Sequence, residues 1–199
     1  MTKTKFSRSR YCIMALICFL TIVSNVLNAQ SLKLNPKTFS MIIMGTTNVH
    51  DFESKVTQAN GELVVKGSKQ VQSLVVEIPV RSIKSGEKVM DNKTYETFND
   101  KQYPTITFRM LEVNPLNVTG NDINVTVIGN LTMAGVTKKI SMISTGKIIK
   151  PGVYEFKGTV NLKMSEFKMK KPTAMLGMMK VGDAITLKYN VTFEGAPIN

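Results

Sequence analysis

Tryptophan is absent from this sequence of 199 residues, histidine occurs once, and there are two cysteines, Cys12 and Cys18. Both cysteines lie in the first 29 residues, which we expect to be cleaved off as a secretory signal peptide. The remaining chain would then have no disulfide and no thiolate for zinc binding or nucleophilic attack. His50 alone cannot form the ligand cluster of a metalloenzyme. We therefore expect no enzymatic activity, no catalytic residues, no cofactor and no metal.

The N-terminal segment predicts export. Its first ten positions hold four basic residues and no acid, and residues 11–23 are apolar apart from one threonine. Ala29 is a suitable small residue for cleavage before Gln30. An uncleaved membrane anchor is the alternative, but the apolar run is short for a permanent span. We expect residues 1–29 to be a signal peptide, residues 30–199 to form one domain, and the protein to be periplasmic or secreted.

The chain is basic. Its formal net charge of +12 would fall to +8 on cleavage, because the first 29 residues contain four bases and no acid. An exported basic protein could contact an anionic membrane surface transiently. Nucleic acid is not an expected partner, because the basic residues are not interleaved with aromatic side chains that stack on bases. The sequence leaves a homodimer open.

Apolar and polar residues alternate through most of the chain after residue 29. In the stretch 123–143, apolar side chains alternate with Asn, Thr, Lys and Ser on both sides of Ala134-Gly135. A period of two predicts strands with one apolar face, and Gly135 suits a tight turn because it adopts positive φ freely. The same alternation predicts strands over residues 39–45, 49–56, 61–66, 71–80, 105–113, 153–164 and 184–193.

Two local signals divide these strands further. Asn60-Gly61 predicts a short turn between the strand over 49–56 and the strand that follows it. Asn114-Pro115 is expected to end the strand that begins at residue 105, because proline cannot donate to a central ladder.

Residues 89–99 predict a short helix. Asp91 or Asn92 would be its N-cap, and Tyr95 and Phe98 have helical spacing. About eight to ten strands with one helical insertion are typical of an all-β barrel or sandwich.

Methionine is unusually frequent, with 11 of the 13 lying after residue 29. Flexible thioether side chains suit a surface that wraps a mobile hydrocarbon chain, and filling of an ordinary core is the alternative. Met175, Met178 and Met179 could also bind a soft metal, although no histidine or cysteine lies beside them. Lysines near this segment would either be solvated or attract an anionic head group.

Five segments, in this order, resemble the YceI-like family of periplasmic proteins. The resemblance implies a lipocalin-like, antiparallel up-and-down β-barrel that binds a long isoprenoid chain, such as a polyprenyl phosphate or a quinone tail. It also implies a protein without established catalytic activity. The segments are TNVHDF at 47–52, IPVRSIKSG at 78–86, YPTITF at 103–108, GNLTMAGVTK at 129–138 and VGDAITL at 181–187.

We therefore expect an eight-stranded barrel that holds one slender lipid for transport, storage or sequestration. His50 would add polarity at one end. Tyr95, Phe98, Phe167, Met175 and Met178 would surround the mouth. The interior would be lined by Phe39, Ile43, Phe52, Phe108, Met110, Met133, Met142, Phe156 and Met164.

Two other interpretations remain open at this point. The barrel could be a structural or interaction protein filled by its own side chains, and it would then contain no elongated cavity. Less favoured is an enzyme that modifies an isoprenoid or a quinone, which would need His50 as its base.

Overall fold

The computed structural model describes residues 29–66, 70–174 and 178–197. Residues 1–28 of the expected signal peptide and Met175 lie outside these ranges.

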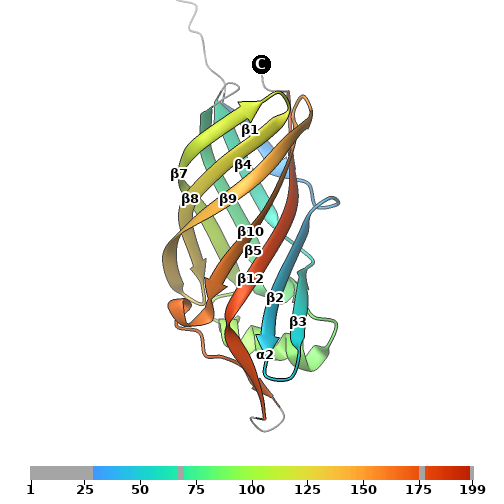
Figure 1. Ribbon diagram of the computed structural model, residues 1–199, viewed down its shortest axis with the longest axis vertical. Helices are drawn as coiled ribbons and strands as arrows, with labels where there is room; N and C mark the ends of the chain where they lie inside the picture. The colour runs from blue at the N-terminus through green and yellow to red at the C-terminus, as the bar shows by residue number, and fades with distance from the viewer. Residues whose placement is uncertain (1–28, 67–69, 175–177, 198–199) are drawn as a thin grey trace, which may run out of the picture.

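Eight antiparallel strands close into an elongated barrel, as predicted (Figure 1). Each strand pairs with the next around the wall, and the last pairs with the first through Leu34 and Phe193. Closure leaves each strand with a neighbour on both sides and directs the apolar faces inward. In order around the wall the strands are β1 (Ala29–Leu34), β4 (Asn60–Lys66), β5 (Gln70–Pro79), β7 (Thr105–Thr119), β8 (Asp122–Met133), β9 (Val136–Lys150), β10 (Val153–Lys163) and β12 (Met179–Glu194).

Three further strands extend one side of this wall. β2 (Ser40–Thr47) pairs with β12 on the edge that β1 also uses, because β10 occupies the other edge. β3 (Asp51–Val56) lies between β2 and the short β6 (Ile83–Lys84). Three bent strands thus each consist of two consecutive elements: β1 with β2, β3 with β4, and β5 with β6. If each bent strand is counted once, consecutive strands are neighbours around the barrel, and its connectivity is up and down.

The turn predicted at Asn60-Gly61 is wrong. Both residues lie within β4 and pair with Glu77 and Val76 of β5. A Cβ atom at position 61 would lie 3.1 Å from the ring of Phe193, so this glycine makes room for an aromatic side chain rather than a turn.

The strand end predicted at Asn114-Pro115 is also wrong. β7 continues to Thr119, and its register with β8 shifts between Val113 and Leu116. A bulge at this point tolerates a residue without a backbone N–H, so proline interrupts the ladder without ending the strand.

The helix is α2 (Lys88–Phe98), as expected, but its N-cap is Glu87 rather than Asp91 or Asn92. The carboxylate of Asp91 instead accepts hydrogen bonds from the backbone N–H and the hydroxyl of Ser85, both at 2.7 Å.

The two ends of the barrel differ. We call one the helix end: it holds α2, the 3-10 helices η1 (Val80–Ser82) and η2 (Met164–Phe167), and the short β11 (Thr173–Ala174) (Figure 1). The predicted turn between β8 and β9 lies there too, with Ala134 at φ 51° and Gly135 at φ 76°. We call the opposite end the hairpin end, because β7 turns into β8 and β9 into β10 there.

Candidate functional site

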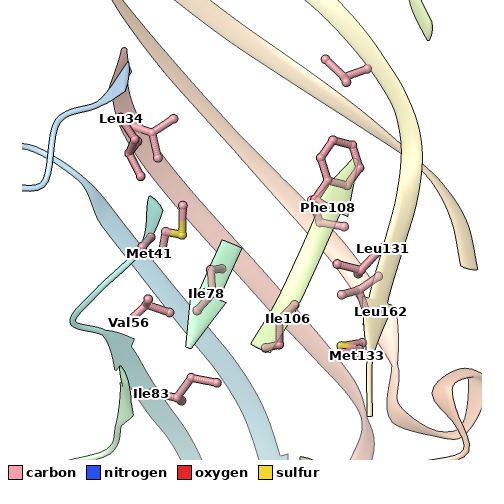
Figure 2. Packing of buried hydrophobic residues seen from close by; sticks show 14 of the residues in the cluster. Leu34, Met41, Val56, Ile78, Ile83, Ile106, Phe108, Leu131, Met133 and Leu162 are labelled. Atoms are coloured by element: carbon pink, nitrogen blue, oxygen red, sulfur yellow. The ribbon is translucent and has the colours of Figure 1, made fainter. Parts of the chain in front are cut away.

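A cavity of about 750 Å³ runs along the inside of the barrel. This volume is in the range of small-molecule binding sites in proteins. Figure 2 shows inward-directed side chains of the wall, among them Ile78, Phe108 and Leu131. Nearly all of the lining is apolar. Its polar side chains, among the described residues, are Gln70, Asn121, Ser144, Lys150, Tyr154 and Tyr189.

The interior is hollow because large aromatic rings lie against the wall. Phe156 faces Gly146 directly across β10 and β9, and a Cβ atom at position 146 would lie 2.6 Å from that ring. Tyr189 faces Gly158 in the same way across β12 and β10. Because the glycines have no side chain, the rings occupy their space and leave the centre free. A barrel filled by its own side chains is inconsistent with this arrangement.

The cavity opens at the hairpin end. Lining residues near the helix end are buried, with Phe98 7% and Met133 3% exposed. Lining residues near the hairpin end are exposed, with Val118 at 39% and Ile149 at 54%, and Lys150 is exposed beside them. The helix end is therefore the floor of the cavity.

The expected mouth was placed at the wrong end. Phe98 of α2 closes the floor, and Phe167 of η2 is fully buried. Tyr95 does not line the cavity: its hydroxyl accepts a hydrogen bond from the Nζ of Lys84 at 2.6 Å. Met178 is 70% exposed beside β12 at the helix end. Helical spacing and loop composition identified residues at one end of the barrel, but they do not decide which end is open.

Of the residues expected inside the barrel, six line the cavity, and Phe98 joins them from the expected mouth. These seven come from β2, α2, β7, β8, β9 and β10, which the fold brings together around one space. They are Ile43, Phe98, Phe108, Met110, Met133, Met142 and Phe156.

Three residues expected inside the barrel lie elsewhere. Phe52 packs over Gly45 and, with Met164, lines a separate pocket of about 70 Å³. Met164 leaves the inward face because β10 ends at Lys163 and η2 begins. Phe39 precedes β2 and packs, partly buried, against the core without reaching the cavity.

His50 also lies outside the cavity. It is exposed in the turn between β2 and β3 at the helix end, and its Nδ1 is 2.8 Å from the backbone oxygen of Asp51. The expectation that it adds polarity to the ligand site is not supported by this position. An isoprenoid-modifying enzyme with His50 as its base is disfavoured for the same reason.

Sequence reasoning missed the polar groups of the lining. Ser144 and Tyr189 are hydrogen-bonded at 2.5 Å within the barrel. Burial raises the pKa of the Tyr189 hydroxyl above its ordinary value, and the hydrogen bond with Ser144 acts in the opposite direction. Burial likewise raises the pKa of Tyr154. Both hydroxyls therefore stay protonated. Ser144 could have been found from the alternation that places Met142 on the inward face of the same strand.

Within the described ranges, no group of three or more His, Cys, Asp and Glu side chains is arranged to hold a metal ion. Among the same residues, no helix has the length and apolarity needed to cross a bilayer.

Comparisons with known proteins agree with this architecture. A family model described as a YceI-like domain matches residues 32–193. None of the curated proteins matches the chain.

Solved structures share the fold. Burkholderia cenocepacia BcnA has 21% sequence identity and a TM-score of 0.64, over 80% of this chain and 98% of that one. A polyisoprenoid binding domain from Saccharophagus degradans, implicated in plant cell wall breakdown, has 13% identity and a TM-score of 0.67, over 85% and 100%. A Campylobacter jejuni YCEI protein has 21% identity and a TM-score of 0.57, over 71% and 84%.

Proposed function

Because the chain belongs to the YceI-like family, we propose that its barrel holds the hydrocarbon chain of a long isoprenoid lipid. The observation that carries this proposal is the elongated apolar cavity of about 750 Å³, which is closed at the helix end and open at the hairpin end. One of the proteins of similar fold is described as a polyisoprenoid binding domain, which supports the choice of an isoprenoid over other slender lipids.

The cavity volume sets the length of chain that is enclosed. If each carbon-sized group takes about the 30 Å³ of a water molecule in the liquid, the cavity holds roughly 25 such groups. At about 0.8 kcal/mol for each buried methylene the gross gain is roughly 20 kcal/mol, and association costs about 4–15 kcal/mol of it. The remainder is enough for a stable complex. A longer chain would extend out of the hairpin end.

The polar end of the lipid would lie at the hairpin end. Lys150, Asn121 and Gln70 line the cavity there and are exposed. An ammonium group at the opening favours an anionic head group such as a phosphate. The tail then points toward Phe98 at the floor.

We propose further that the protein is exported to the periplasm or secreted, and that it carries or sequesters its lipid without chemical conversion. The basic, apolar N-terminal sequence supports export. The net positive charge supports transient contact with an anionic membrane surface, where such lipids are found.

Binding to delipidated protein tests the proposal. Geranylgeraniol and geranylgeranyl phosphate, titrated by calorimetry, are expected to bind at one site per chain with a negative heat-capacity change, which marks burial of apolar surface. The matched control replaces Leu131, which is directed into the cavity, with glutamate, and it is expected to lose binding. A wild-type protein that binds neither compound would refute the proposal.

A further inference from the structure

One row of paired residues crosses four neighbouring strands of the barrel wall. Tyr189 of β12 pairs with Gly158 of β10, and Gly158 pairs with Ser144 of β9. Because Gly158 has no side chain, the ring of Tyr189 lies over it and reaches across a whole strand to Ser144. The next residue in the row, Val125 of β8, is apolar and also lines the cavity.

The two hydroxyl groups together have one proton more than their mutual hydrogen bond uses. Either oxygen can be the donor in the bond of 2.5 Å, so one O–H is left over in both arrangements. Among the hydrogen bonds of the described residues, none gives this second proton an acceptor in the protein. Both residues line the cavity. A donor without a partner in an apolar space is costly, and an acceptor on a ligand would remove that cost.

The pair lies deep inside the barrel. Lys150 at the hairpin end lies six positions after Ser144 on β9. With a rise of about 3.3 Å per residue and the usual strand tilt, the pair is about 15 Å below the opening.

The charge of the surroundings restricts the ligand chemistry. Lys150 is the charged residue of the described lining, and it lies at the opening rather than beside the pair. A phosphate at this depth would be an unpaired buried charge. A neutral oxygen acceptor has no such cost, and the raised pKa of Tyr189 keeps that hydroxyl available as a donor.

We propose that Ser144 and Tyr189 form a hydrogen-bond donor site for a neutral carbonyl oxygen, such as that of a quinone ring or an amide, carried about 15 Å into the barrel. The inference rests on the proposed function of the cavity as a lipid site. It adds that a lipid with a neutral carbonyl group can bind with this group inside the barrel. A lipid with a carbonyl head group would place that head inside the barrel, whereas a prenyl phosphate would keep its head at the opening.

The test compares one ligand that has carbonyl groups with one that has no polar atom. Decylubiquinone and hexadecane are titrated into delipidated wild-type protein and into Tyr189→Phe, which removes the hydroxyl and keeps the ring over Gly158. The matched control is Thr145→Val, which removes a hydroxyl from the exposed neighbour of Ser144 on the same strand, outside the cavity lining. The double variant Ser144→Ala with Tyr189→Phe removes both hydroxyls and leaves none unpaired, so it preserves the fold if the single variant is unstable.

The double variant is expected to bind decylubiquinone about 2- to 10-fold more weakly and hexadecane unchanged. Tyr189→Phe leaves the O–H of Ser144 free to donate, so it is expected to lose less affinity for decylubiquinone than the double variant. The infrared carbonyl band of bound decylubiquinone should lie at lower frequency in the wild type and in Thr145→Val than in the double variant. Oleamide in place of the quinone shows whether an amide carbonyl is accepted equally. Equal affinities for decylubiquinone in all variants, or equal losses for both ligands, would overturn the inference and leave the lipid cavity intact. A wild type that binds neither ligand would instead refute the proposed function.

Discussion

Replacing Gly146 with alanine tests the claim that aromatic rings against the wall keep the barrel hollow. The new Cβ atom would lie 2.6 Å and 2.8 Å from two ring atoms of Phe156 and 2.9 Å from the backbone oxygen of Glu155, where ordinary contacts are 3.4–4 Å. The backbone oxygen is held in the sheet, so the ring is expected to move about 1 Å or more into the cavity.

The cost follows from this overpacking. We expect a loss of about 1–3 kcal/mol in the free energy of unfolding, which lowers the melting temperature by roughly 2–12 °C in a domain of this size. A displaced ring that takes the space of two methylene groups would weaken lipid binding by about 1.6 kcal/mol, or roughly tenfold. Circular dichroism of delipidated protein and calorimetry with geranylgeraniol measure the two effects.

Two variants complete this experiment. Thr145→Val changes the exposed neighbour on the same strand and should leave both properties unchanged. Phe156→Leu combined with Gly146→Ala provides space for the added methyl group and should recover part of the lost affinity. Wild-type melting and binding in Gly146→Ala would show that the ring does not depend on the glycine, and the explanation of the hollow interior would be wrong.

Three other predictions address the opening, the histidine and acid stability. Lys150→Gln should weaken binding of geranylgeranyl phosphate several-fold and reduce its salt dependence, with geranylgeraniol unaffected; equal losses for both lipids would argue against a head group at the hairpin end. His50→Ala should change neither lipid affinity nor, by more than about 0.5 kcal/mol, stability, because the side chain is exposed; a larger loss of affinity would contradict the position assigned to the site. Hydrogen bonds from the hydroxyl and backbone N–H of Ser165 hold the pKa of Asp183 below its ordinary value of 3.8. Its contribution to stability is therefore present above that value and lost as pH falls below it, so Asp183→Asn should flatten the decrease of the melting temperature in acid, and an unchanged slope would count against it.

Alternation of side chains was enough to predict most of the strands, because burial of one face imposes a period of two wherever a wall is apolar inside and solvent-exposed outside. It did not predict β1, which begins at Ala29, the last residue of the expected signal peptide. The turn at Ala134-Gly135 was predictable for an equally local reason, since glycine adopts positive φ freely. The positive φ of Ala134 was not predictable in this way. Gly61 shows the limit of this reasoning. It has the composition of a turn, but its role depends on Phe193, which is distant in sequence.

The site was less predictable than the fold. Alternation tells which face a residue occupies, but not its height along the barrel, which depends on register and closure. Met164 and Phe52 were therefore expected in the cavity and lie outside it, while Tyr189 lies in the strand predicted over residues 184–193 but was not among the expected site residues. Glycines on the inward face, such as Gly146 and Gly158, were a usable signal: each one faces an aromatic residue on the next strand.

Electron density inside the barrel tests the central claim most directly. A crystal structure of the protein soaked with geranylgeranyl phosphate should show a continuous, slender density from Phe98 at the floor to the opening beside Lys150. An interior that stays free of density at full ligand concentration, with the lipid bound on the outer surface, would contradict the account.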